Sequence, residues 1–286
     1  MEDSLLTMVL LPAALGVIMI SLGLELTRAD FARIARQPRS VAIGLANLLL
    51  ISPALAFAIA TLFDLSPGLA VGLVLLGASP GGTMANVLTH LARGDTALSV
   101  TMTAISSLAA AVTVPLYLEL AANHFDAGAL VGDVAMGGIV ARVLLVTVVP
   151  VAIGMAIRAR WPQRTQAARP TVAKVAVTLF LLVVVGAVIA EHETALENLG
   201  EVAAAALALN VAAMAVSFSV AKLARLDDRS ATAIALELGV HNATLAIAIG
   251  ASLAAVLTIP AAVYAMFMFV TGGLFARLMY HRNIRV

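Results

Sequence analysis

Cysteine is absent from the 286 residues of this chain, which excludes disulfide bonds, cysteine-ligated zinc and iron–sulfur clusters. Charged residues are scarce as well: they make up 12% of the sequence, about half the share found in ordinary soluble domains. Hydrophobic residues make up 62%, and the mean hydropathy is +1.05. This composition predicts an all-α polytopic membrane protein.

The N-terminus lacks the basic residues of a secretory signal. It begins with Met1, Glu2 and Asp3, and no small-residue cleavage site follows the first apolar run. Both features favour a transmembrane helix that is retained over a signal peptide that is removed. The net charge of +1 does not identify partners, and nothing in the sequence indicates a nucleic acid or a protein partner.

Nine stretches are long enough to cross a bilayer, which takes about 20 mainly apolar residues. They lie at residues 5–24, 41–62, 69–91, 98–121, 136–157, 172–190, 202–221, 231–253 and 260–278. Helix-start signals support some of these boundaries: Pro67 follows Ser66, and Asn198 with Glu201 resembles a capping box.

Basic residues are confined to alternate connections, with one exception. Sixteen of the 17 lie after the first, third, fifth, seventh and ninth spans: Arg28, Arg33, Arg36, Arg39, Arg93, Arg158, Arg160, Arg164, Arg169, Lys174, Lys222, Arg225, Arg229, Arg277, Arg282 and Arg285. The positive-inside rule then predicts an outside N-terminus and a cytoplasmic C-terminus, as an odd number of spans requires. The exception, Arg142, could snorkel outward, pair with Glu119 or Asp133, or attract an anionic substrate.

Two of the spans contain breaks. Pro80, Gly81 and Gly82 cannot continue a regular helix, and a second interruption follows Glu237 around Gly239. Irregular backbone at membrane depth is tolerated only where it is buried in protein or lines a polar cavity, and paired broken helices are typical of secondary transporters. The second half-helices should begin near Thr83 and Asn242, where their N-termini favour an anion, while the carbonyls that end the first halves favour a small cation.

A weak internal repeat accompanies the breaks. Pro12 and Gly16 in the first span have the same spacing as Pro150 and Gly154 in the fifth. With the two broken helices, this predicts two inverted repeats of four and five spans within one transporter unit covering residues 1–286. The first repeat would cover residues 4–122 and the second residues 134–280.

Glu237 is the only acidic residue in the interior of a span. A lone ionised carboxylate in hydrocarbon must be paired, protonated or metal-bound, so Glu237 is either a structural hydrogen-bonded acid, a sodium ligand or a proton carrier. Asn86, Ser99 and Thr103 offer neutral oxygens of the kind that Na⁺ accepts, and Ser99 and Thr103 share one helix face. His241 is either a neutral buried histidine or a group that titrates near neutral pH. No spacing suggests a transition metal.

Two motifs resemble those of the bile acid:sodium symporter family. The first is the run from Pro80 to Thr103, the second runs from Glu237 to Ala246, and the likeness extends from Leu10 through the last span. The resemblance implies two inverted repeats, a panel domain and a core domain, and two discontinuous helices that cross. This chain lacks the equivalent of the family's first helix, which leaves nine spans. The core would comprise residues 67–122 and 200–258, and the panel the remaining spans.

The resemblance also implies a set of site residues. The first sodium site would be formed by Asn86, Ser99, Thr103, Glu237 and the backbone of Ala85. At the second site the family's glutamines fall on Leu48 and His241, which leaves Glu237 and the backbone of Val240. Asn47 is turned away from position 48 by about 100°. The resemblance thus implies one retained sodium site, with the second lost, rebuilt or replaced by protonation of His241. Substrate would meet Gly82, Thr83, Asn86, His241 and Asn242.

The sequence therefore predicts a sodium-coupled symporter in the bacterial inner membrane, surrounded by lipid. It would import an organic anion, either bile-acid-like or a small carboxylate such as pantoate, by alternating access. The alternatives are a proton-coupled carrier or exporter that uses Glu237 and His241, and a membrane ligand sensor that moves nothing. An enzyme is not expected, because no nucleophile–base pair or metal motif occurs.

Overall fold

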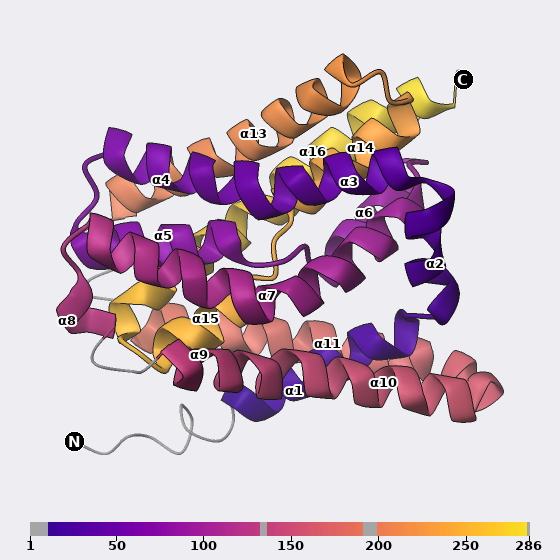
Figure 1. Cartoon of the computed structure of the whole chain (residues 1–286), viewed down its shortest axis with the longest axis horizontal. Coiled ribbons are helices and arrows are strands. Elements are labelled where there is room, and N and C mark those ends of the chain that lie inside the picture. The colour runs from indigo at the N-terminus through magenta and orange to yellow at the C-terminus, as the bar shows by residue number, and fades with distance from the viewer. Residues whose placement is uncertain (1–10, 132–135, 191–198, 285–286) are drawn as a thin grey trace.

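The computed structural model describes residues 11–131, 136–190 and 199–284, and this part of the chain is a bundle of long helices (Figure 1). Five helical segments in it are long and apolar enough to cross a membrane: Pro38–Leu62, Thr96–His124, Pro162–Gly186, Gly200–Leu223 and Ala255–Asn283. Pro12–Glu25 and Pro67–Ala78 are shorter apolar helices. The prediction of an all-α polytopic membrane protein is confirmed.

The helices follow one another with short connections. In the first half they are α1 (Leu11–Glu25), α2 (Arg28–Arg36), α3 (Pro38–Ala46), a π-helical turn η2 (Asn47–Ile51), α4 (Ser52–Leu62), α5 (Pro67–Ala78), α6 (Thr83–Leu91), α7 (Thr96–His124) and α8 (Gly128–Val131). In the second half they are α9 (Met136–Val143), a π-helical turn η3 (Leu144–Val148), α10 (Val149–Arg160), α11 (Pro162–Ala190), α13 (Leu199–Leu223), α14 (Asp228–Gly239), α15 (Ala243–Ala251), a 3₁₀ turn η4 (Ala255–Thr258) and α16 (Ile259–Asn283).

Local sequence explains many of these boundaries. Pro67 opens α5, as predicted, but Ser66 makes no side-chain cap hydrogen bond. Asp95 and Asp227 do cap α7 and α14, by accepting the backbone N–H groups of Leu98 and Ser230. The predicted capping-box residue Asn198 lies outside the described residues.

Each π-helical turn precedes a proline. Pro53 has no N–H to offer the carbonyl of Leu49, one turn earlier in the helix. The hydroxyl of Tyr117 on α7 donates to that carbonyl at 2.8 Å. A side chain from a neighbouring helix thus replaces the backbone donor that the proline removes.

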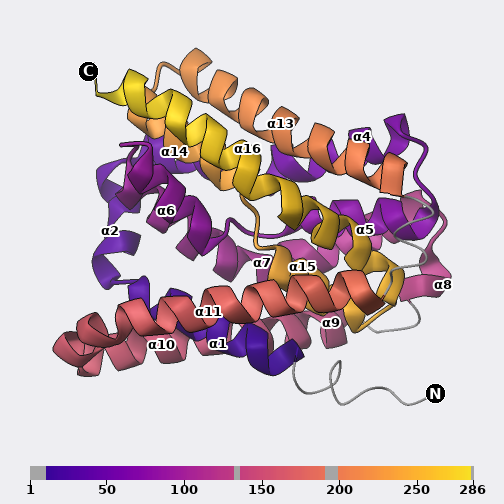
Figure 2. The same ribbon diagram turned by 180° about the vertical axis from the view of Figure 1, so that it is seen from behind.

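The helices form two outer layers with a third between them (Figures 1 and 2). One outer layer contains α1, α9–α10 and α11, in which α1 packs along α10 and α11. The other contains α3–α4, α13, α14 and α16. The middle layer contains α5, α6, α7 and α15, and α5 packs on α4 and α7.

The two predicted breaks are confirmed. α5 ends at Ala78 and α6 begins at Thr83, while α14 ends at Gly239 and α15 begins at Ala243. The breaks cross and exchange backbone hydrogen bonds: the Gly82 N–H donates to the Val240 carbonyl at 2.9 Å, and the Asn242 N–H donates to the Pro80 carbonyl at 2.8 Å. Each break therefore satisfies backbone groups of the other where water is scarce.

The number of residues between the two breaks differs from the number between the two proline–glycine pairs that suggested the internal repeat. Gly81 and His241, which oppose one another at the crossing, are 160 residues apart in sequence. Asp64 and Arg225, which end α4 and α13 with positive φ, are 161 residues apart. Pro12 and Pro150 are only 138 residues apart. The surroundings of the glycines differ too, because Gly154 packs on Gly23 whereas Gly16 has open space beside it.

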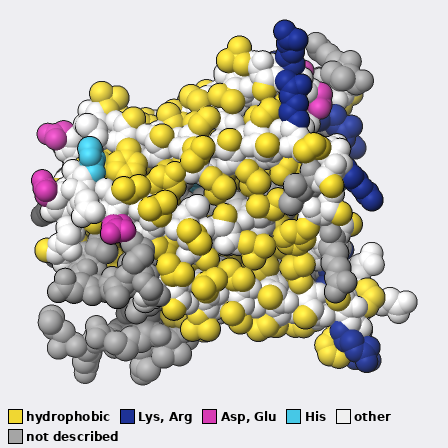
Figure 3. Space-filling view, in the orientation of Figure 1, with side chains coloured by type: hydrophobic (Ala, Val, Ile, Leu, Met, Phe, Trp, Pro, Cys, Tyr) yellow, Lys and Arg dark blue, Asp and Glu magenta, His cyan; other side chains and the backbone are white. Residues whose placement is uncertain are grey.

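Some predicted loops are helical. Residues 164–174 belong to α11, which begins ten residues before the predicted span, and α2 occupies the connection between the first two spans. Hydropathy marks only the part of a helix that lies in lipid, whereas Arg and Lys continue a helix readily. On the face seen in Figure 3, the Lys and Arg side chains gather at one end, beyond a broad hydrophobic band. Arg142 is in α9, but its side chain lies outside the described residues, as does Asp133.

Candidate functional site

Four predicted sodium-site residues come together beside the crossing. Asn86 lies one turn into α6, Ser99 and Thr103 lie one turn apart on α7, and Glu237 lies in the last turn of α14. All four side chains are buried, and Ser99, Thr103 and Glu237 have no exposed surface. Two consecutive helices, α6 and α7, and the remote helix α14 therefore contribute oxygen atoms to one enclosed cluster.

Hydroxyl groups hold one oxygen of the Glu237 carboxylate. The Ser99 hydroxyl lies 2.6 Å from Glu237 Oε1 and 2.8 Å from Asn86 Oδ1. The Thr103 hydroxyl lies 2.7 Å from Glu237 Oε1 and 3.3 Å from Asn86 Oδ1. The two hydroxyl groups have one proton each, so only two of these four contacts can be hydrogen bonds at one time. The acceptor lone pairs of the cluster therefore outnumber its hydroxyl protons.

The remaining polar atoms of the cluster have no partner. Glu237 Oε2 and Asn86 Nδ2 are buried without a hydrogen bond within the described part of the chain, and no ion pair with Glu237 occurs there. A buried carboxylate needs a proton or a counter-charge. Neutral oxygens around a single carboxylate are also the ligands that a hard monovalent cation accepts. The residues present therefore fit a sodium ion that is carried as a co-substrate.

The two predicted backbone contributors lie next to this cluster. Ala85 is fully buried in α6, and its N–H donates to the Gly82 carbonyl at 2.9 Å. The Val240 carbonyl accepts the Gly82 N–H in the crossing. A carbonyl oxygen has a second lone pair, so this bond leaves Val240 able to bind a cation as well.

His241 lies in the crossing and is held by two serine residues. Its Nδ1 lies 3.0 Å from the Ser79 carbonyl, which can only accept, so Nδ1 carries a hydrogen. Its Nε2 lies 3.0 Å from the hydroxyl of Ser52, and the same hydroxyl lies 2.7 Å from the Gly77 carbonyl. When His241 is neutral, Nε2 accepts a hydrogen bond from the Ser52 hydroxyl, which then cannot donate to the Gly77 carbonyl. In protonated histidine, Nε2–H donates to Ser52 and all three bonds form together.

The sequence did not single out Ser52, because the family resemblance places a glutamine of the second sodium site at position 48, which is Leu48 here. Leu48 is 1% exposed and packs in an apolar cluster with residues such as Val41 and Leu98. Asn47 donates to the Ile43 carbonyl at 2.7 Å, and its Oδ1 has no partner in the described part of the chain. Ser52 lies one turn beyond Leu48 and therefore on the same side of the helix. A polar side chain at this position, directly before Pro53, was the signal that could have identified it.

The carbonyls that end the first half-helices accept hydrogen bonds from neutral side chains of neighbouring spans, which the sequence did not predict. Ser52 donates to the Gly77 carbonyl of α5. Asn210 and Tyr264 donate to the Gly239 carbonyl of α14 at 2.7 and 3.0 Å. The predicted role of such carbonyls in cation binding, together with the side-chain oxygens, stays a prediction.

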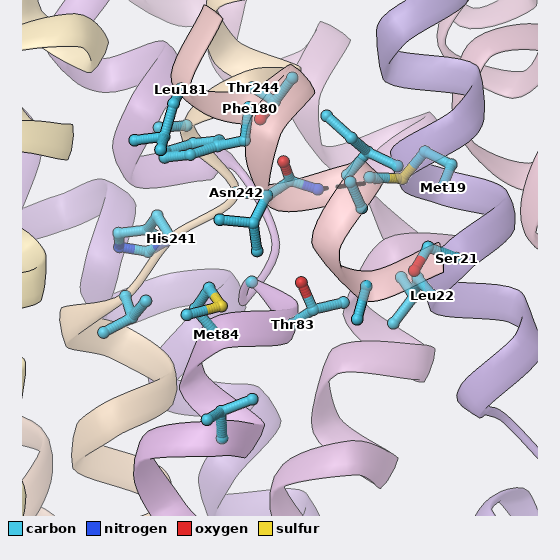
Figure 4. A pocket seen from close by; sticks show the side chains of 18 of the residues that line it. Met19, Ser21, Leu22, Thr83, Met84, Phe180, Leu181, His241, Asn242 and Thr244 are labelled. Atoms are coloured by element: carbon cyan, nitrogen blue, oxygen red, sulfur yellow. Dashed lines mark hydrogen bonds between the residues drawn. The ribbon is translucent and has the colours of Figure 1, made fainter. Parts of the chain in front are cut away.

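A cavity of about 260 Å³ lies on the other side of the crossing, between α1, α11 and the two breaks (Figure 4). Gly82, Thr83, His241 and Asn242 line it, as predicted for the substrate site. Asn86 belongs to the oxygen cluster and does not line this cavity.

The opposite walls of the cavity were not predicted. They include Met19, Ser21 and Glu25 of α1 and Phe180 and Leu181 of α11, most of them seen in Figure 4. The apolar side chains among them give no local signal, because an apolar residue of a membrane helix is the same in sequence whether it faces lipid or a cavity, whereas Ser21 and Glu25 were polar signals that the sequence reasoning passed over.

Asn242 connects the two sides of the cavity. Its Oδ1 caps α15 by accepting the Leu245 N–H at 3.1 Å, and its Nδ2 lies 3.9 Å from the Met19 sulfur across the cavity (Figure 4). α6 and α15 both begin at this cavity, so two positive helix ends converge on it.

Two broken helices that cross beside a buried carboxylate, with a cavity at the crossing, define a polytopic helical transporter. Comparison with known proteins identifies the family: the chain belongs to the sodium bile acid symporter family, whose model matches residues 12–198.

Similar proteins occur in bacteria, plants and animals. The chain is 31% identical over 263 residues to "Uncharacterized sodium-dependent transporter YocS" of Bacillus subtilis, covering 92% of this chain and 80% of that protein. It is 32% identical over 236 residues to "Probable sodium/metabolite cotransporter BASS2, chloroplastic" of rice, covering 82% of this chain and 55% of the relative. It is 29% identical over 237 residues to the human ileal sodium/bile acid cotransporter, covering 81% of this chain and 66% of the relative.

Proposed function

We propose that this protein is a sodium-coupled symporter that imports an organic anion by alternating access. The observation that carries this proposal is the buried Glu237 carboxylate, whose Oε1 accepts the hydroxyls of Ser99 and Thr103 beside the amide oxygen of Asn86, and whose Oε2 has no partner among the described residues. The matched relatives add support, because their names describe sodium-dependent transporters and cotransporters. Na⁺ bound in this cluster would neutralise the carboxylate and favour a substrate-competent crossing.

We further propose nine spans in the bacterial inner membrane, with the N-terminus outside and the C-terminus in the cytoplasm. Spans 1–4 and 5–9 would form two inverted repeats. The 160-residue spacing of the breaks supports this arrangement, because it relates each of the first four spans to the span five places later, which runs in the opposite direction.

The domain division we propose differs from the one expected from sequence. α4 packs on α5 and α13, and α16 packs on α13 and α14. We therefore assign the spans at 41–62 and 260–278 to the core domain with the broken helices. The panel then consists of α1, α9–α10 and α11, which pack on one another.

Substrate identity is proposed from the size and charge of the cavity. Two helix N-termini, at α6 and α15, contribute about half a positive charge each at the crossing, which suits one carboxylate group there. Glu25, the acidic side chain among the described lining residues, is on α1 and lies 3.8 Å from Arg169. A volume of 260 Å³ equals that of roughly nine water molecules and is below the range usual for drug-sized ligands. These features favour a small carboxylate such as pantoate over a bile-acid-like steroid.

The cavity extends from the crossing toward Glu25 and Val87, which lie near the basic connections at the cytoplasmic side in the proposed topology. This supports an inward-facing conformation. The sodium gradient and the membrane potential would drive import, the potential by about 2.3 kcal/mol per net charge at 100 mV.

A second candidate is proton-coupled transport. The contacts of His241 favour it: Nδ1–H donates to the Ser79 carbonyl, and protonation would let Nε2–H donate to the Ser52 hydroxyl while that hydroxyl donates to Gly77, so that all three hydrogen bonds form at once. A protonated His241 would then supply one positive charge in place of the second sodium ion that the family resemblance implies.

A ligand screen tests the proposed function. Thermal unfolding of the purified protein should be measured with small monocarboxylates, dicarboxylates and bile acids, each in sodium and in potassium at equal ionic strength. We expect a small monocarboxylate to raise the unfolding temperature only when sodium is present, because both bind the folded state. Stabilisation that depends on pH and not on sodium would favour proton coupling. Stabilisation in neither series would contradict both.

A further inference from the structure

The second oxygen of Glu237 lies against a glycine of the opposite broken helix. A methyl group built on Gly81 would lie 1.7 Å from Glu237 Oε2 and 2.9 Å from the carboxyl carbon. Carbon atoms of real side chains do not approach other heavy atoms this closely, so only a hydrogen atom fits between Gly81 and the carboxylate. The φ of Gly81 lies outside the left-handed region that favours glycine, so its role here is space and not backbone freedom.

The carboxylate cannot move aside without cost. Its other oxygen, Oε1, accepts hydrogen bonds from Ser99 and Thr103 at 2.6 and 2.7 Å. Swinging Oε2 away from position 81 would rotate or withdraw Oε1 from these hydroxyls. Gly81 therefore fixes where Glu237 lies as directly as the two hydroxyl groups do.

Gly81 also sits between the cation cluster and the substrate cavity. Its neighbours Pro80 and Gly82 make the two backbone hydrogen bonds to Asn242 and Val240. Gly82, Val240 and Asn242 line the cavity. A movement of the carboxylate would thus press on a backbone segment whose next bonds belong to the cavity wall.

We propose that Gly81 is a positioning residue that places Glu237 in the cation cluster and transmits the state of its carboxylate to the cavity. This inference rests on the proposed sodium binding at Glu237. No side chain lies between Gly81 and the Glu237 carboxylate. A cation that draws the carboxylate toward itself therefore directly changes the contact between Glu237 Oε2 and the backbone of the crossing. Any side chain at position 81 would separate the cluster from the cavity.

The test compares Gly81→Ala with Gly16→Ala, whose added methyl group would meet nothing within 4 Å. The probe is sodium alone. One readout is the sodium concentration that gives half-maximal thermal stabilisation. The other is the alkylation rate of a single cysteine introduced by Val87→Cys in the cavity wall, which would be the only thiol in this cysteine-free chain.

In the Gly81→Ala chain we expect the sodium requirement to rise at least tenfold and the alkylation rate to lose its dependence on sodium. Gly16→Ala should behave like the unsubstituted protein in both measurements. A Gly81→Ala chain with unchanged sodium titration and unchanged sodium-dependent alkylation would overturn the proposal.

A second variant separates steric positioning from general damage. Glu237→Asp withdraws the carboxylate by about 1.5 Å, the length of one carbon–carbon bond, and so makes room for the added methyl group. In sodium-free buffer, the double variant Gly81→Ala with Glu237→Asp should therefore unfold at a higher temperature than Gly81→Ala alone. A double variant no more stable than Gly81→Ala, or as poorly folded, would contradict the positioning role.

The same series distinguishes this inference from the proposed function. If the unsubstituted protein gains no stability from sodium, the proposed sodium site fails, while the sodium-free comparison still decides whether Gly81 positions Glu237. If the unsubstituted protein responds to sodium and Gly81→Ala responds equally well, the sodium site stands and the role of Gly81 fails.

Discussion

The residues around Glu237 have fewer hydroxyl protons than hydrogen-bond acceptors. The hydroxyls of Ser99 and Thr103 each lie near both Glu237 Oε1 and Asn86 Oδ1, and each hydroxyl has only one proton. Thr103 can turn its proton to the Ser99 carbonyl, 3.1 Å away, when a cation takes its place. The cluster is thus able to exchange a proton-bonded arrangement for a cation-bonded one without moving the backbone.

Thr103→Val should weaken sodium binding while leaving the fold intact, because valine keeps the shape and removes one ligand oxygen. A hydrogen bond or ligand contact to a charged group is worth about 1.5–3 kcal/mol, so the sodium concentration for half-maximal stabilisation should rise roughly 10- to 100-fold. Thr113→Val on the same helix is the matched control, since Thr113 donates only to the Ala109 carbonyl. Equal sodium titrations for the two variants would remove Thr103 from the site.

If His241 carries the coupling proton, His241→Gln should flatten the pH dependence of transport or ligand stabilisation. Glutamine keeps a hydrogen-bonding side chain but cannot titrate, and its amide oxygen is a ligand of the kind that Na⁺ accepts. Ser52, Ser79 and the ring of Tyr264 face His241, and Glu237 lies one turn earlier on its own segment. The exposed His281 on α16 gives the control variant His281→Gln. Matching pH profiles for all three proteins would dismiss the proton role.

At the scale of helices, polar side chains from neighbouring spans close the ends that the breaks create. Ser52 donates to Gly77, 25 residues later, and Asn210 donates to Gly239, 29 residues later. In each case the donor lies on the span that precedes the broken helix. The similar placement of the two caps agrees with the 160-residue spacing of the breaks.

An ion-pair cluster joins α13, α14 and α16 at the end of the molecule that carries the C-terminus. Asp228 lies 2.6 Å from Lys222 and 2.7 Å from Arg282. Hydrogen bonds from Arg282 and then Lys222 hold the pKa of Asp228 below its ordinary value. The stabilisation is therefore complete above the ordinary pKa of an aspartate and is lost as the pH falls through the lowered value.

Asp228→Asn should lower the unfolding temperature at pH 7 by a few degrees, which corresponds to roughly 1 kcal/mol for partly exposed pairs. The difference from the unsubstituted protein should begin to shrink as the pH falls below the ordinary pKa of an aspartate, because protonation then removes the charge of Asp228. Glu119→Gln, at an exposed position of α7, is the control. A difference that stays constant from pH 7 to pH 3 would show that the ion pairs do not contribute.

The sequence was informative where the physics is local. Pro80 and Gly81 predict the first break by what they cannot do in a helix, and Glu237 stands out because an acid in an apolar run is costly. The start of α11 at Pro162 and the π-helical turns before Pro53 and Pro150 were missed, although each proline gave a signal. Hydropathy does not record where a helix begins outside the lipid.

Contacts between remote segments could not be predicted in the same way. Asn210 and Tyr264 act on a backbone carbonyl, which looks the same at every position of the sequence. The approach of Gly81 to Glu237 depends on how two broken helices cross, and no spacing within either motif encodes it. The grouping of oxygen side chains around Glu237 was therefore predictable, whereas its closure by backbone and glycine was not.

At the scale of the whole molecule, the crossing separates a buried cation cluster from an open cavity. The cluster lies among α6, α7 and α14, and the cavity lies between the crossing and the layer of α1 and α11. Relative movement of the two layers would change the cavity and leave the cluster intact. Under the proposed function, one ion site would then serve both orientations of the transport cycle.

The most direct test is the thermal unfolding of the purified protein and of Glu237→Gln, each titrated with sodium chloride against potassium chloride at constant ionic strength. Glutamine keeps the size of the side chain and removes its charge, so sodium should raise the unfolding temperature of the unsubstituted protein in proportion to RT ln(1 + [Na⁺]/Kd) and leave Glu237→Gln unchanged. A Glu237→Gln protein that gains the full sodium-dependent stabilisation would contradict the assignment of the cation site.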